Sequence, residues 1–243
     1  MTTLVRITIA LVLALLLSSC GFDLNFGDFG SGEKGNGIVV EETREVTEEF
    51  TMVSASEGIE VYVTQGNDFD ISVEADENIM DLIGTDIRNG KLKIHAIENI
   101  GRATKKVYVT LPNVTGLYAS SGSHLTAENK INSSKLEIDA SSGALLEASV
   151  NVNDMEIDAS SGANITLSGT AKEVYVDGSS GAYIKATDLS TISCKADASS
   201  GANLTINVSG NLTADASSGG NISYKGDPSV QKNKSVSGSV SKY

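Results

Sequence analysis

The chain has 243 residues, of which 31 are acidic and 18 basic, so its formal net charge is −13. This balance argues against a nucleic-acid-binding surface, which needs clustered cations, and disfavours electrostatic attachment to an anionic membrane. Trp is absent, Pro occurs twice, and Gly, Ser, Thr and Asn are frequent. Such a composition is typical of many short strands and turns rather than long helices.

The N-terminus resembles the signal segment of a bacterial lipoprotein. A positive charge at Arg6 precedes an apolar run over residues 7–17, which is too short to span a bilayer. The run ends in Leu17-Ser18-Ser19-Cys20, which resembles the lipobox, a small-residue stretch before a lipidated cysteine. The resemblance implies that residues 1–19 are removed and that Cys20 carries the lipid. An ordinary secretory signal, with Cys20 as a bystander, is the alternative.

The residues after Cys20 predict an anchor and a tether. Gly21 follows the cysteine in place of Asp, which in lipoproteins of this kind implies the bacterial outer membrane, at its cell-surface or periplasmic face. Residues 20–36 are Gly-rich without a hydrophobic period, so we expect a flexible tether. Cys194 is the one other cysteine, so lipidation of Cys20 leaves no internal disulfide.

Alternating segments predict strands from residue 48 onward. Apolar and polar residues alternate within 48–66, 70–76, 91–96 and 106–112, and we expect these segments to form the first coils of a repeating structure. The stretch 76–84 begins with an Asp suited to cap a helix and has apolar residues at helical spacing, so it predicts one short helix. Glu57-Gly58 resembles a corner between strands.

The triplet Ser-Ser-Gly occurs six times in the second half of the chain. Successive copies are separated by 21, 19, 19, 20 and 18 residues, which is close to one turn of a β-solenoid and far short of a propeller blade. The six triplet glycines are Gly122, Gly143, Gly162, Gly181, Gly201 and Gly219.

Aligning the copies on this glycine separates apolar from polar columns. Odd offsets are apolar or small and even offsets are mostly polar, as expected for an extended chain with one face inside. Three residues after the glycine the column reads Leu125, Leu146, Ile165, Ile184, Leu204 and Ile222. Because the alternation keeps its parity through the triplet, we expect the serine before each glycine to face inward.

These columns predict a single right-handed parallel β-helix over residues 37–228, with coils of about 19 residues. Like residues would stack on like residues at the ~4.8 Å spacing of neighbouring strands, and the crossover rule favours the right hand. Ser-Ser-Gly would be a corner at which Gly supplies the unusual backbone angles. Residues 229–243 lose the pattern and predict a loose C-terminal tail after Pro228.

Several motifs together resemble the bacterial family called putative auto-transporter adhesin, head GIN domain. They are Gly58-Ile59-x-Val61 followed by Thr64-Gln65-Gly66, then Glu74-Ala75-Asp76-Glu77-Asn78, then Leu111-Pro112, with Ser/Gly-rich repeats after them. The resemblance covers residues 37–226. It implies a secreted or lipid-anchored protein with a β-helix-like fold, and it carries over no catalytic residue.

The corner serines do not predict catalysis. A serine nucleophile needs a base and a group that orients the base, whereas the histidines are only His95 and His124 and no G-x-S-x-G motif occurs. We therefore expect no catalytic residue, no cofactor and no enzymatic activity. The alternative is a carbohydrate-active enzyme on a β-helix, a polysaccharide lyase or hydrolase, which needs acids converging with Lys or Arg in a cleft.

A column of aspartates precedes the corners. Five carboxylates at rung spacing could hold a row of Ca²⁺ ions, or each could cap its own turn and face water. We favour the capping interpretation and expect no metal, because the dense Gly-and-Asp loops of Ca²⁺ solenoids are missing. The column comprises Asp139, Asp158, Asp177, Asp197 and Asp215.

One outward column predicts a recognition strip, because flat solenoid faces suit extended partners. Two residues after each corner glycine, Leu145 and Tyr183 would be exposed among polar neighbours. We name this column the exposed strip. It comprises His124, Leu145, Asn164, Tyr183, Asn203 and Asn221.

We expect a non-enzymatic envelope protein, an adhesin or scaffold, held to the membrane by its N-terminal lipid and binding an unidentified protein or glycan. A periplasm-facing structural lipoprotein is the alternative.

Overall fold

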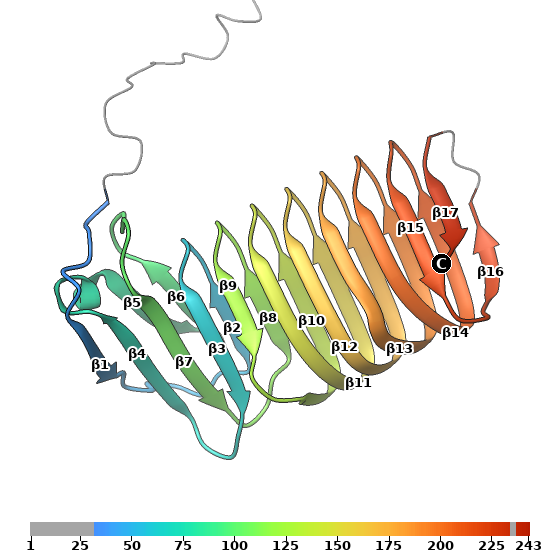
Figure 1. Cartoon of the computed structure of the whole chain (residues 1–243). Helices are drawn as coiled ribbons and strands as arrows, with labels where there is room; N and C mark the ends of the chain where they lie inside the picture. Colours follow the sequence, from blue (N-terminus) through green and yellow to red (C-terminus); the bar gives the residue numbers. More distant parts are fainter. Residues whose placement is uncertain (1–31, 234–236) are drawn as a thin grey trace, which may run out of the picture. The chain divides into compact units, whose positions relative to one another are not determined.

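A computed structural model describes residues 32–233 and 237–243, which form a nearly all-β body (Figure 1). The predicted signal segment, Cys20 and residues 20–31 of the predicted tether lie outside the described residues. Among the described residues, no helix has the length and apolar character needed to cross a membrane.

The regular part of the body is a stack of long strands, most of which run from one Ser-Ser-Gly corner to the next. Each strand pairs in parallel with the following one, in a register that brings Asp139 opposite Asp158 and Asp158 opposite Asp177. The predicted parallel β-solenoid with coils about 19 residues apart is confirmed, and it has about seven turns. The long strands are β10 (Ile131–Ala140), β11 (Leu145–Ala159), β12 (Asn164–Gly178), β13 (Tyr183–Ala198) and β14 (Asn203–Ala216).

Each coil has two limbs, one leading into a corner and one leaving it (Figure 1). The shorter strands β8 (Gly116–Ala119) and β9 (His124–Ala127) show this separation, because β8 pairs with the end of β10 whereas β9 pairs with the start of β11. We call the limbs before the corners the pre-corner sheet and the limbs after them the post-corner sheet. The aspartate column belongs to the first and the exposed strip to the second.

The corners are tight turns with two successive left-handed residues. Ser161 has φ 50° and Gly162 has φ 73°, and the Ala163 N–H donates to Ser160 O at 3.0 Å. These are the features of a type I′ turn. The Gly162 N–H also donates to Ser180 O in the next coil at 3.1 Å, so the hydrogen-bond ladder continues through the corner.

The corner geometry corrects the expected direction of the middle serine. In all six triplets this serine is exposed, whereas the residue after the glycine, such as Ala163, is buried. Two left-handed residues reverse the chain, so the alternation of an extended strand does not pass through them.

The expected capping by the aspartates is also wrong, since no carboxylate of the column accepts a backbone N–H in the described part of the chain.

The core is built from the inward columns that the repeat predicts. Every apolar residue three positions after a corner glycine is buried, from Leu125 at 0 % exposure to Ile222 at 1 %. Burying a Leu or Ile side chain contributes about 1.5–3 kcal/mol, so each coil adds a layer that covers the layer before it. Repetition of these residues therefore explains the regularity of the stack.

The N-terminal part contains both parallel and antiparallel strands. Four strands continue the parallel stack: β2 (Met52–Ala55), β3 (Glu60–Gln65), β6 (Lys91–Ala96) and β7 (Lys105–Leu111). Three run antiparallel to their neighbours: β1 (Val39–Thr43), β4 (Asp70–Asp76) and β5 (Ile83–Arg88). The expectation of simple first coils is thus only partly met. Glu57-Gly58 does form a corner, with positive φ at both residues.

The predicted short helix is a 3₁₀ helix, η1 (Glu77–Leu82), and Asp76 does not cap it through its side chain. The Asp76 carboxylate, only 3 % exposed, instead accepts the backbone N–H groups of Gly37 and Thr104, the latter at 2.7 Å. The end of the predicted tether is also bonded to the body, since Glu33 N–H donates to Asn99 O at 2.9 Å.

The solenoid continues into the segment expected to be a loose tail. After β15 (Asn221–Lys225) come β16 (Ser229–Lys232), which pairs with β14, and β17 (Ser239–Lys242), which pairs with β15. Val230 lies opposite Leu212 and Val240 opposite Ile222. These two valines keep the inward alternation after the triplet has been lost, so residues 229–232 and 239–242 form a further coil.

Candidate functional site

The exposed strip is continuous in the post-corner sheet. Leu145 and Tyr183 lie on either side of Asn164 in the strand register, and their exposed fractions are 41 % and 43 %. At the usual strand spacing, two rungs separate these side chains by roughly 10 Å. The surrounding positions are polar, and Asn221 Nδ2 donates to Asn203 Oδ1 at 3.2 Å. The strip therefore presents two apolar side chains on a rigid polar face.

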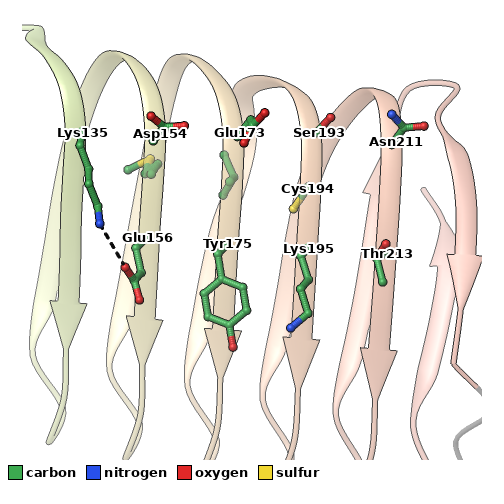
Figure 2. Close-up of a pocket in the computed structure, with 12 residues that line it drawn as sticks. Lys135, Asp154, Glu156, Glu173, Tyr175, Ser193, Cys194, Lys195, Asn211 and Thr213 are labelled. Carbon is green, nitrogen blue, oxygen red and sulfur yellow. Dashed lines mark ion pairs between the residues drawn. The ribbon is translucent and has the colours of Figure 1, made fainter.

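A shallow groove of about 470 Å³ crosses five coils of the pre-corner sheet (Figure 2). Buried Met155, Val174 and Cys194 form part of its lining, and acidic and basic side chains stand on successive strands above them. The charged and polar lining residues are Lys135, Asp154, Glu156, Glu173, Tyr175, Ser193, Lys195, Asn211 and Thr213.

Each of the two lysines of the groove lies close to one carboxylate. Lys135 Nζ lies 3.9 Å from a carboxylate oxygen of Glu156, as the dashed line in Figure 2 marks. Lys195 Nζ lies 3.4 Å from an oxygen of Asp197 and 4.9 Å from the centre of the Tyr175 ring. Burial and the nearby Asp177 and Asp197 carboxylates raise the pKa of Tyr175 to about 12. Tyr175 is therefore a neutral phenol at pH 7 and a poor general base.

The aspartate column stands beside this groove on the same sheet. Burial, followed by the charge of Asp177, raises the pKa of Asp158, and burial, followed by the charge of Asp197, raises that of Asp177. The carboxylates thus repel one another along the stack. Within residues 32–233 and 237–243, no group of three or more His, Cys, Asp or Glu side chains is placed to hold a metal ion.

The two histidines lie on different strands, and neither bonds to a corner serine in the described structure. His95 lies in β6, with Nε2 3.6 Å from Asp86 Oδ2, and His124 lies in β9, with Nε2 3.4 Å from Thr126 Oγ1. Burial raises the pKa of the Cys194 thiol to about 12, so this cysteine is a core residue and a weak nucleophile.

Sequence reasoning identified the exposed strip but not the groove. The sequence pattern that could have predicted the groove is the column six residues before each corner glycine. In this column Glu156, Tyr175 and Lys195 occupy the same position in consecutive copies. A column that changes charge from coil to coil differs from the uniform aspartate column, and parallel in-register pairing makes its members neighbours.

Comparisons with known proteins place this architecture in a family. The sequence model of the family described as putative auto-transporter adhesin, head GIN domain, matches residues 49–228. A search of curated proteins gave no match.

Several solved bacterial structures share the fold. A putative adhesin from Bacteroides fragilis has a TM-score of 0.79 at 18 % identity, covering 87 % of this chain and all of its own. A putative adhesin from Parabacteroides merdae has a TM-score of 0.71 at 21 % identity, covering 86 % of this chain and 98 % of its own. A putative lipid binding protein from Parabacteroides distasonis has a TM-score of 0.70 at 18 % identity, with the same two coverages.

At these identities the solved structures establish the common fold alone, whereas the family match spans most of the chain. The chain therefore belongs to the putative auto-transporter adhesin, head GIN domain family.

Proposed function

We propose that this protein is a non-enzymatic binding module of the cell envelope, an adhesin or scaffold that contacts a protein or glycan through the post-corner sheet. The observation that carries the proposal is the placement of Leu145 and Tyr183 in one outward row of rigid strands. Paired strands lose little conformational entropy on binding, and an extended partner laid across the coils would meet both side chains.

The proposed attachment to the envelope is a lipid on Cys20. The signal-like segment before it ends in Leu-Ser-Ser-Cys, and Gly21 favours the outer membrane. The described body begins within the Gly-rich segment that follows. In this arrangement the lipid holds the N-terminal side of the solenoid near the membrane, and the coils project their faces toward a partner.

Removing the two apolar side chains of the exposed strip tests the proposed binding surface. The double variant Leu145→Ser, Tyr183→Ser should lose binding by at least about tenfold, the equivalent of 1.4 kcal/mol, in a screen against matrix proteins and glycans. Its thermal stability should change little, because both positions are on the surface. The matched control is Ile192→Ser, which removes a side chain that is 54 % exposed and outside the strip.

Two results would reject the strip. One is full binding by the double variant, and the other is an equal loss in Ile192→Ser. An unfolding midpoint close to that of the unmodified protein in each variant shows that the comparison concerns binding and not folding.

The location has its own experiment, protease digestion of intact and lysed cells. Digestion of the body on intact cells supports an adhesin on the outer surface. Protection until lysis rejects the adhesin role and favours the periplasm-facing structural lipoprotein. A Cys20→Ser variant that still sediments with membranes would contradict the lipid anchor.

The groove around Tyr175 favours a second candidate, a polysaccharide lyase or hydrolase, because it brings carboxylates and lysines together. Two observations weaken it: the lysines are engaged by Glu156 and Asp197, and Tyr175 stays protonated far above neutral pH. Degradation of a polysaccharide that is lost in Glu156→Gln would establish the enzyme in place of the binding module.

A further inference from the structure

The N-terminal part of the pre-corner sheet contains a hollow in which cations outnumber acids. Its volume is about 250 Å³, and its lining consists of Ser54, Asp86, Arg88, Lys91 and Lys93. Three cations and one carboxylate give it a net charge of +2, in a chain whose formal net charge is −13. We call it the cationic pocket.

Strand pairing brings these residues together from separate segments. In the β5–β6 hairpin, Arg88 lies opposite Lys91 and Asp86 opposite Lys93, and the parallel pairing of β2 with β6 puts Ser54 opposite Lys93. These positions alternate with buried Leu92 and Ile94, so all five side chains are on the outward face.

The framework of the pocket is held in place by backbone and ring contacts. The hairpin turn is type I′, with φ 53° at Asn89 and 71° at Gly90. Gly90 O accepts the N–H groups of Thr51 at 3.0 Å and of Met52 at 3.2 Å, which ties the turn to β2. On the other side, Lys91 Nζ lies 3.5 Å from the centre of the Tyr118 ring, so a cation–π contact positions its charge.

None of the three cations forms an ion pair within the part of the chain that the structure describes. The one acid of the pocket, Asp86, lies 3.6 Å from His95 Nε2. The next outward acids, Glu137 and Asp139, are on β10, and three rungs separate the backbones of β10 and β6 by roughly 14 Å. Lys91 extends over Tyr118 toward β10, and its charge opposes the burial that raises the pKa of Asp139, whereas Arg88 and Lys93 have no such acid nearby on that side of the described structure.

Clustered like charges on paired strands destabilise a sheet. Lys91 is partly compensated by the Tyr118 ring and Asp139, whereas Arg88 and Lys93 form no ion pair among the described residues, although the chain has an excess of acids. A bound anion would remove this cost. Arg88 offers a planar donor fork that matches the geometry of a carboxylate, sulfate or phosphate, the lysines add point charges, and the Ser54 hydroxyl adds a neutral donor.

We propose that the cationic pocket binds one oxyanion group, such as a carboxylate, sulfate or phosphate, carried by an otherwise neutral glycan. The neighbouring aspartate column explains the restriction to a single charge. A polyanion laid along the pre-corner sheet would meet Asp139, Asp158 and Asp177 on consecutive coils and be repelled. The pocket lies on the opposite sheet from the exposed strip, so the proposal does not depend on that strip.

The test is an NMR titration of the isotope-labelled full chain with sodium sulfate, against sodium chloride at matched ionic strength. Sulfate should produce saturable shifts confined to the amides around Ser54, Arg88 and Lys93, with a dissociation constant in the millimolar range. Arg88→Gln and Lys93→Gln should each weaken binding about tenfold. The matched control is Lys185→Gln, which removes the same charge from the post-corner sheet and should leave binding unchanged.

Shifts that do not saturate, or equal weakening by Lys185→Gln, would overturn the site, because either indicates nonspecific charge screening. The source of the anion is then tested with a neutral trisaccharide bearing one sulfate, its uncharged parent and a heparin fragment. The monosulfated sugar should bind at least as tightly as sulfate, and the parent should not compete. Tighter binding of the heparin fragment than of the monosulfated sugar would contradict the single-charge proposal.

Discussion

The N-terminal strands and the Ser-Ser-Gly coils use the same inward packing but distribute their polar groups in different ways. In the coils, in-register parallel pairing puts each residue beside its own counterpart, so the aspartates form one uniform acidic column. In the N-terminal part, the antiparallel strands β4 and β5 interrupt this pattern and bring together unlike residues from distant segments. The repeated coils thus form a uniform surface, whereas the antiparallel strands form local clusters of unlike residues.

Two kinds of aspartate illustrate the difference. Asp76 has no equivalent in the repeated coils and is buried. Its carboxylate accepts hydrogen bonds from the backbone of two separate segments. Asp177 is one of five equivalents, is half-buried, and has like charges as neighbours on the stack. We therefore expect the first carboxylate to stabilise the fold and the second to destabilise it at neutral pH.

The largest effect is expected at Asp76. Asp76→Ala should lower the free energy of unfolding by about 3 kcal/mol, because the backbone donors of Gly37 and Thr104 lose a charged acceptor in a buried position. Chemical denaturation measures this loss. Asp215→Ala, which removes a carboxylate from the uniform column, is the control and should be close to neutral. Equal losses in the two variants would remove the proposed distinction between the two regions.

A smaller loss is expected at a corner of the regular coils. In Gly162→Ala the added methyl group meets no atom within 4 Å, so the cost is only that of a left-handed alanine at φ 73°, about 1–2 kcal/mol. Denaturant unfolding again gives the value. Ser161→Asn should be neutral or mildly stabilising, because Asn tolerates the left-handed region better than Ser. A neutral Gly162→Ala would show that the corner relaxes to another turn type.

The smallest effect is the pH response of the aspartate column. The pKa values of Asp158 and Asp177 are raised in the folded protein, first by burial and then by a neighbouring carboxylate. Protons then bind the folded state more tightly. The resulting stabilisation is complete below the unfolded pKa near 3.8 and is lost as the pH rises through the folded values.

Asp177→Asn measures this contribution. Lowering the pH from 7 toward 4.5 should raise the melting temperature of the unmodified protein more than that of the variant. At pH 7 the variant should be more stable by about 0.5 kcal/mol, the usual magnitude for a like-charge pair on neighbouring strands. A variant that is less stable at pH 7 would show that Asp177 has a favourable partner.

The coils were predictable from sequence because equivalent residues recur in it at a nearly constant spacing. The spacing of Gly143 and Gly162 gave the coil length, and the column containing Leu146 gave the inner face. The direction of Ser161 was not predictable from parity, since two left-handed residues end the extended alternation. The right-handed sense rests on the crossover rule alone and stays a prediction.

The N-terminal contacts were harder to infer because they join segments that share no repeat. The strands 70–76 and 91–96 were expected with these bounds, yet alternation gives no strand direction, so the antiparallel pairing of β4 with β7 was missed. The strand β5, which pairs antiparallel with β6, was not predicted as a strand. The cationic pocket depends on that direction, which puts Arg88 beside Lys91. Ser54 comes from a segment more than thirty residues earlier, and no local pattern connects the two.

The uninterrupted hydrogen-bond ladder of the corners has a consequence for how such a protein can change during evolution. Duplication or loss of one coil of about 19 residues leaves the remaining corners opposite equivalent corners, because Gly162 N–H bonds to Ser180 O just as Gly143 N–H bonds to Ser161 O. Each added coil lengthens the body by ~4.8 Å. The length of the body can therefore be adjusted in single steps, without redesigning either sheet.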